Sequence, residues 1–154
     1  MVKSNNENRF PDRGRNSWNA NRTEIESPQD VFTKAGFDET WLTEGANEKL
    51  PDFAEKIGKY MARNGLTNSK IRSIYGEIKR IQMGKFEIEK ASFFLLRPKV
   101  AYALGRDEKN KGLQLFKIVF DKTYPFVKDH TTYHNFCNLI EAILAYHKAY
   151  GGKD

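Results

Sequence analysis

From about residue 28 onward, apolar residues recur every three or four positions, the spacing that lines them up along one side of an α-helix. Glycine and proline interrupt this pattern and mark where one helix stops and the next can begin. The chain shows no convincing strand and no internal repeat. The pattern therefore predicts helices in six ranges: 28–36, 51–64, 67–84, 86–104, 113–127 and 136–150.

The helix predicted at 67–84 has the simplest pattern. Its isoleucines alternate spacings of three and four, which makes one narrow apolar stripe for packing against the rest of the protein. The four residues of the stripe are Ile71, Ile74, Ile78 and Ile81. Either Thr67 or Asn68 can cap the start of this helix, and Gly84 is expected to end it.

The helix predicted at 86–104 differs because it is apolar on more than one side. A helix of that kind is usually surrounded by its neighbours, so we expect it to be the central helix of the fold. Pro98 removes one backbone donor, which predicts a kink or a restart at that point. Gly105 is the expected C-terminal stop.

Together these helices predict an all-α fold, a single compact bundle of five or six helices at 29–154. Residues 1–28 are rich in Asn, Arg and Ser, and Phe10, Trp18 and Ile25 are their only sizeable apolar side chains. That is too little to offset the entropy of ordering the backbone, so we predict a flexible tail. Its basic run Arg13–Arg15 can attract nucleic acid, but the tail nearly balances its charges, which favours a solvated tail.

Composition limits the class of protein. No stretch approaches the roughly 20 uncharged apolar residues that a membrane span needs, and the first residues lack the apolar core of a secretory signal. We therefore expect a cytoplasmic protein with no membrane partner. The single cysteine, Cys137, excludes an internal disulfide and any multi-cysteine metal framework, so packing must supply the stability.

The basic charge is concentrated in the middle of the chain. The net charge is +6 and the pI is about 9.3, which favours a polyanionic partner without identifying it. The excess of Lys and Arg over Asp and Glu is +1 in residues 1–28, −4 in 29–58, +9 in 59–123 and zero in 124–154. The middle helices are therefore the expected binding region.

One group of residues has the spacing of a metal site. His130, His134 and Cys137 have the spacing that would place them along one side of a helix, with Glu141 one turn further on, although His130 can also precede the helix itself. The pattern lacks the glutamate next to the first histidine that zinc proteases use, and lone cysteines are commonly buried apolar residues. We therefore predict no metal here, although a metal-dependent nuclease built on these four residues stays an alternative.

His147 is the best candidate for a general base, but no partner for it can be named. Glu141 lies six residues earlier, on a different face of the helix, so a packing role for His147 is the better interpretation. The sequence also contains no phosphate-binding loop, no nucleophile elbow and no acidic cluster for catalytic Mg²⁺. We predict a protein that is not an enzyme and needs no cofactor.

The basic residues make a stronger case for binding. Arg72 and Lys79 lie seven residues apart on one flank of the 67–84 helix, with Gly76 between them. A glycine inside a helix costs about 1 kcal/mol relative to alanine, which indicates that something docks closely there. Three more cations extend the positive field around the next helix, and they are Arg97, Lys99 and Arg106. Arg80 is a weaker candidate because it lies opposite the isoleucine stripe.

Three segments carry a resemblance to a known family. LTNSKIRSIYGEIKRIQ at 66–82, LLRPKVAYALGR at 95–106 and FCNLIEAILAYHKAYGGK at 136–153 occur in that order. In this combination they closely resemble the small subunit of type III-A CRISPR (Csm) interference complexes. The resemblance covers about residues 60–154, and the first 60 residues fall outside it.

The resemblance implies an all-helical, non-catalytic subunit present in several copies, stacked as a short filament beside the backbone subunits that hold the guide RNA. It implies that this subunit lines the channel for the target transcript, in a complex that also contains a large subunit. Because guide pairing supplies the sequence specificity, such a protein should read backbone charge and helical shape. We therefore expect the RNA contacts to be Arg72, Lys79, Arg80, Arg97, Lys99 and Arg106.

A DNA-binding regulator is the main alternative from another class. The 66–82 segment can be read as the recognition helix of a helix-turn-helix dimer, with a tight turn at Asn64-Gly65 before it. Its outward face offers few Asn or Gln side chains for paired contacts with bases, which argues mildly against this interpretation.

Overall fold

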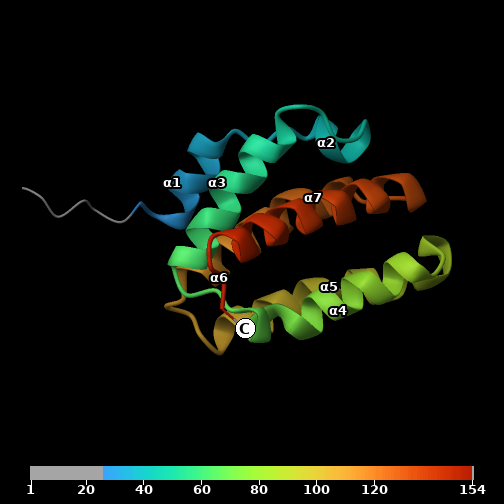
Figure 1. Ribbon diagram of the computed structural model, residues 1–154. Helices are drawn as coiled ribbons and strands as arrows, with labels where there is room; N and C mark the ends of the chain where they lie inside the picture. Colours follow the sequence, from blue (N-terminus) through green and yellow to red (C-terminus); the bar gives the residue numbers. More distant parts are fainter. Residues whose placement is uncertain (1–25, 154) are drawn as a thin grey trace, which may run out of the picture.

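The computed structural model describes residues 26–153, so nearly all of the predicted tail at 1–28 lies outside the described residues. The described part is all-α and has no strand (Figure 1). Six of its α-helices have eight or more residues, α2 has four, and a 3₁₀ turn follows α6. The elements are α1 (Pro28–Ala35), α2 (Thr40–Thr43), α3 (Leu50–Arg63), α4 (Asn68–Met83), α5 (Phe86–Gly105), α6 (Lys111–Thr123), η1 (Tyr124–Phe126) and α7 (His130–Ala149). The predicted helical bundle is confirmed.

Most helix ends follow the predicted stop signals. Gly36 ends α1 with a φ of 78°, a left-handed conformation that glycine adopts without strain. Gly84 follows α4 as predicted, and Thr67 precedes it, but the Thr67 side chain makes no capping hydrogen bond. The α-helix α6 ends before Pro125, and the 3₁₀ turn η1 follows it. The range 113–127, which was predicted as one helix, is therefore not a single α-helix.

Helix α7 lies at the centre of the bundle (Figure 1). The helices α2 and α3 cover one side of it, and the hairpin formed by α4 and α5 covers the other. Helix α3 packs very closely against α7. A Cβ atom added at Gly58 of α3 would lie only 2.5 Å from the carbonyl oxygen of Ile143 in α7. Seven residues of α7 are buried, and they are Tyr133, Phe136, Cys137, Leu139, Ile140, Ile143 and His147.

The prediction that the 86–104 helix is central was wrong. Helix α5 packs on α4 and α6 and touches α7 only slightly, so much of its surface faces outward. Ile88, Leu95 and Tyr102 are 75%, 59% and 67% exposed. The second apolar side of α5 is therefore an outer surface of the chain. The helix also continues through Pro98 without the restart that we had considered.

His147 is a packing histidine, as predicted. It is fully buried, and its Nε2 atom lies 2.7 Å from the carbonyl oxygen of Leu66. Gly152 packs directly on its ring, since a Cβ atom there would lie 2.2 Å from the ring carbon Cε1. The segment after α7 then reaches the start of α4, where the Asn68 N–H donates to the carbonyl oxygen of Lys153.

Candidate nucleic-acid interface

Helix α4 stands between two surface grooves. Its isoleucines point inward, and its two flanks line a groove against α7, which Ile71 also lines, and another against α5. The two cavities have similar volumes, about 650 Å³ beside α7 and about 670 Å³ beside α5. Four of the six predicted contact residues line them, two in each groove.

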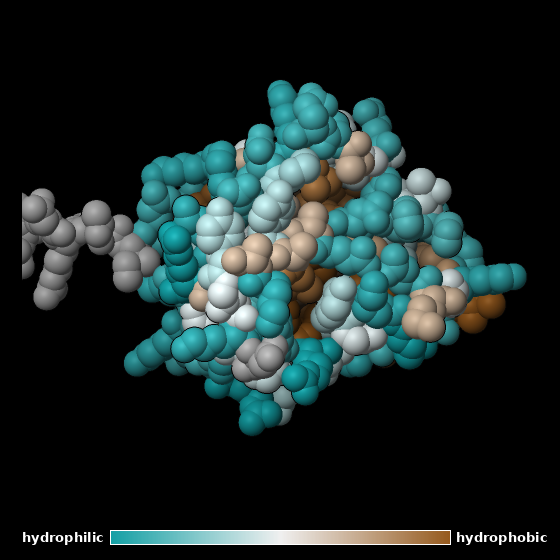
Figure 2. Space-filling model, viewed as in Figure 1, coloured by the Kyte–Doolittle hydropathy of each residue, from teal (hydrophilic) through white to brown (hydrophobic). Residues whose placement is uncertain are grey.

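The α4/α7 groove has an apolar floor and a charged rim. Figure 2 shows this apolar hollow between the two helices. Its floor includes Tyr75, Leu144 and Ala145, and its rim carries Arg72 and Lys79. Lys148, which the sequence analysis did not identify, also lines it from α7.

The positive charge of Lys79 is partly balanced by a carboxylate. Its Nζ atom lies 2.6 Å from Oε1 of Glu141, and this hydrogen bond raises the pKa of Lys79 above its usual value. The same ammonium group lies 5.8 Å from the ring centroid of Tyr75. Arg72 has no ion pair within residues 26–153 and is exposed. Arg72 is therefore the more available of the two cations.

The α4/α5 groove is more polar. Lys99 and Arg106 enter it from α5, and the guanidinium carbon of Arg106 lies 5.9 Å from the ring centroid of the exposed Tyr102. Neither cation belongs to an ion pair of the described chain. Lys70 lines the same groove but is paired with Asp107 at 2.7 Å. The charge of Arg106 therefore lies beside an aromatic ring, and Lys99 brings a second positive charge that also attracts the carboxylate of Glu77.

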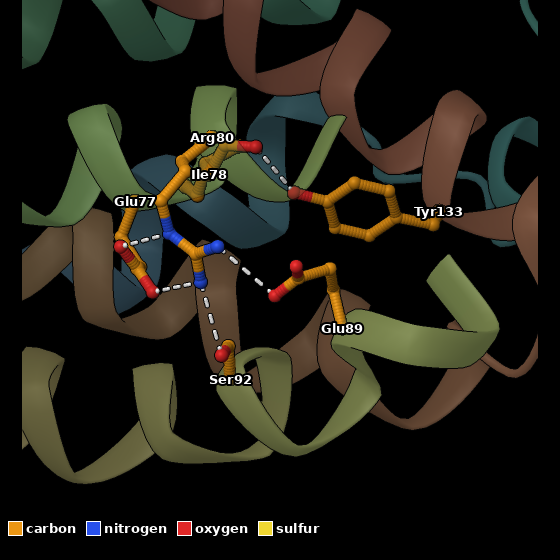
Figure 3. Close-up of polar contacts among 6 residues, drawn as sticks. All are labelled: Glu77, Ile78, Arg80, Glu89, Ser92 and Tyr133. Atoms are coloured by element: carbon orange, nitrogen blue, oxygen red, sulfur yellow. Dashed lines mark hydrogen bonds and ion pairs between the residues drawn. The ribbon is translucent and has the colours of Figure 1, made fainter. Parts of the chain in front are cut away.

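Arg80 is bound within the protein (Figure 3). Its guanidinium group donates two hydrogen bonds to Glu77, at 2.7 and 3.0 Å, and one each to Glu89 and Ser92, both at 3.0 Å. These bonds raise the pKa of Arg80, and the bond from Arg80 is the main reason that the pKa of Glu77 is lowered. Arg80 thus connects α4 to the first turns of α5, and its positive charge is already balanced by the carboxylates of Glu77 and Glu89.

Arg97 lies apart from both grooves. Its guanidinium carbon is 5.6 Å from the ring centroid of Tyr124, in the 3₁₀ turn after α6. Arg97 is exposed and belongs to no ion pair in the part of the chain that the structure describes. The six predicted residues therefore occupy four environments of one hairpin.

The residues that sequence reasoning missed are those that only the fold brings to α4. Lys148 comes from α7, more than 60 positions after the α4 residues that it joins, and no local pattern connects them. Tyr75 and Tyr102 lie within segments that were singled out, but their exposure beside cations could not be read from spacing.

The four residues of the candidate metal site do not converge. His130 and His134 are exposed, Cys137 is fully buried, and Glu141 pairs with Lys79. Burial raises the pKa of the Cys137 thiol to about 11, which disfavours the thiolate that metal binding needs. Within residues 26–153, no group of three His, Cys, Asp or Glu side chains is placed to hold a metal ion.

Comparison with known proteins identifies the family. No curated protein and no solved structure matches the chain. None of the described helices is long and apolar enough to cross a membrane. Residues 44–153 match the family model described as Csm2 Type III-A, so the match begins well before residue 60, where the resemblance had been expected to start. It covers most of the chain, includes α3 to α7 and does not favour the DNA-binding regulator. The chain therefore belongs to the Csm2 family, the small subunit of type III-A CRISPR complexes.

Proposed function

We propose that this subunit lines the channel that holds the guide RNA and the target transcript, and that it supports antiviral defence without catalysing a reaction itself. One observation carries the proposal. Four of the six predicted cations are exposed and have no ion pair within the described chain, and they are Arg72, Arg97, Lys99 and Arg106. Uncompensated cations gathered on one hairpin suit a phosphate backbone.

The expected contribution of each residue to RNA binding depends on whether it lines a groove and whether an acidic side chain already pairs with it. Arg72, Lys99 and Arg106 line grooves and belong to no ion pair of the described chain, so we expect them to contribute most. Arg97 is available but lies outside the grooves, and Lys79 must first share its charge with Glu141. Arg80 should contribute least, because its donors are already taken by Glu77, Glu89 and Ser92.

The protein partners in the proposal are the backbone and large subunits and further copies of this chain, all in the cytoplasm. The outer face of α5 supports protein contacts, since large apolar residues are exposed along it. Soluble proteins rarely leave a contiguous apolar patch uncovered unless something binds it. The side chains concerned are Ile88, Phe94, Leu95 and Tyr102.

The test starts from a tagged copy of the chain expressed in its native host. We expect guide RNA and the other subunits to co-purify at moderate salt. The variant Arg72→Ala/Lys99→Ala/Arg106→Ala should assemble but bind target RNA more weakly. The salt dependence of its binding should be less steep by about one unit of log Kd per log salt for each phosphate that the variant no longer neutralises.

A matched control removes the same amount of charge elsewhere. Lys34, Lys49 and Lys56 lie in the acidic segment 29–58, in or beside α1 and α3. The variant Lys34→Ala/Lys49→Ala/Lys56→Ala should bind RNA like the wild type. If both triple variants bind RNA equally well, the hairpin does not contact RNA and the proposal fails.

A further inference from the structure

Gly76 occupies a helical position for which the described chain offers no structural reason. It lies in the middle of α4, its φ is not positive, and a Cβ atom added there would meet nothing within 4 Å. Glycine weakens a helix relative to alanine. Gly76 is exposed, whereas the helical glycines Gly58 and Gly112 are buried, and a side chain at either would collide with backbone atoms.

Gly76 opens into the α4/α7 groove. The groove is lined beside it by the ring of Tyr75 and by Leu144 and Ala145 from α7. These apolar groups form a floor that matches the face of an aromatic ligand better than a phosphate or a sugar. The missing side chain keeps that floor accessible.

The rim of the same groove favours an anionic ligand. On the α4 side, Arg72 belongs to no ion pair of the described chain, and Lys79 shares its charge with Glu141. An apolar floor beneath a cationic rim suits a nucleotide, whose base is flat and apolar on its faces and whose phosphate is charged. A paired base hides its faces by stacking within the helix, so only an unstacked base can use this floor.

We propose that the α4/α7 groove accepts the base of one unpaired nucleotide of bound RNA and that Gly76 lacks a side chain in order to admit it. The inference rests on the proposed RNA-binding function and goes beyond contact with the phosphate backbone. Gly76 then determines whether the base can enter, and Arg72 holds the phosphate beside it.

The test uses the complex purified through the tagged full-length chain. Target RNAs carry a single 4-thiouridine that is either paired or mismatched with the guide, and irradiation followed by mass spectrometry maps the crosslinks on this chain. We expect crosslinks near Tyr75 and Leu144 that are stronger from the mismatched position. Gly76→Leu should remove them and weaken binding of the mismatched RNA about tenfold or more, while binding of the fully paired RNA changes little.

Two controls separate this effect from damage to the fold. Thr33→Leu adds side-chain bulk to an exposed position of α1, outside the grooves and away from α5, and it should leave crosslinks and affinity unchanged. Thermal unfolding of the isolated full-length chain should show that Gly76→Leu is no less stable than the wild type, because the space at Gly76 is open.

The remaining outcomes are distinguishable. If Gly76→Leu keeps both the crosslinks and the affinity, the groove holds no base and the inference is overturned while the proposed function stands. If Gly76→Leu instead loses its protein partners, the groove binds protein and the inference is likewise overturned. If the wild-type chain gives no RNA crosslink on α4 or α5 and the cation variants bind RNA normally, the proposed function itself fails, and the inference fails with it.

Discussion

Helices α5 and α7 have the same length of 20 residues and both are rich in apolar side chains, yet they lie in very different surroundings. Helix α7 is enclosed between α3 on one side and the α4–α5 hairpin on the other. Helix α5 buries only Phe86, Phe93, Leu96 and Val100 and exposes a second apolar side. An apolar side of a helix therefore does not by itself show that the same chain covers it.

The largest expected effect is on the free energy of unfolding, and it distinguishes two neighbouring phenylalanines of α5. Phe93 is fully buried and its ring packs on those of Phe86, Tyr124, Tyr133 and Phe136, whereas Phe94 is 50% exposed. Phe93→Ala should lower the free energy of unfolding by about 3–5 kcal/mol. Phe94→Ala should lower it by about 1 kcal/mol or less. Urea unfolding of the isolated chain measures both, and equal losses would show that α5 is covered on both sides.

The next effect tests how tightly α7 is enclosed. Gly58→Ala forces a methyl group against the backbone of α7, where overpacking costs about 1–3 kcal/mol and outweighs the higher helix propensity of alanine. Gly105, at the end of α5, is the matched control because its Cβ would meet nothing within 4 Å. Gly105→Ala should be neutral or stabilising by up to about 1 kcal/mol. Thermal unfolding of the two variants compares them, and a stable Gly58→Ala protein would mean that α3 and α7 can move apart easily.

Local patterns in the sequence were sufficient to predict the helices but not their arrangement. The stripe of isoleucines in α4 and the glycine after α1 each determine a structure within a few residues. Which helix is central depends on how all the helices pack against one another, and neither periodicity nor composition contains that information. The mistake about α5 arose because an inner side and an exposed apolar side look alike in sequence.

A smaller effect concerns the connection between α4 and α5. Because Arg80 lowers the pKa of Glu77 below its ordinary value of 4.5, the ionised Glu77 stabilises the fold above that pH, and this contribution is lost as pH falls through the lowered pKa. Arg80→Ala should therefore be slightly less stable than wild type near neutral pH, and the difference should shrink in acid. Melting temperatures between about pH 7 and pH 3 test this, and a constant difference across that range would contradict it.

The smallest expected effect is on the outer face of α5. Leu95 is 59% exposed, so Leu95→Ser should change the free energy of unfolding of the isolated chain by no more than about 0.5 kcal/mol. The same variant in the assembled complex shows whether another protein covers this face. A large loss of stability in the isolated chain would mean instead that copies of the chain already pair through α5 in solution.

The candidate interface was predictable in part. Charge counting and helical spacing were enough to select the α4–α5 hairpin and its six cations. They could not separate Arg80, which binds Glu77 and Glu89, from Arg72, which has no acidic partner in the described chain, because ion pairs between helices depend on tertiary packing. Nor could they find the groove beside Gly76, since its second wall comes from α7.

The central position of α7 has a consequence for synthesis of the chain. Of the described helices, α7 is the last to leave the ribosome, yet α3 and α4 both pack their apolar sides on it. Until it emerges, other helices cover those sides only in part, so the nascent chain exposes surface that favours aggregation. The local α4–α5 hairpin can form early, but the bundle closes only when α7 inserts between two layers that are already made. Folding of the described bundle is therefore completed only after α7 has been synthesised.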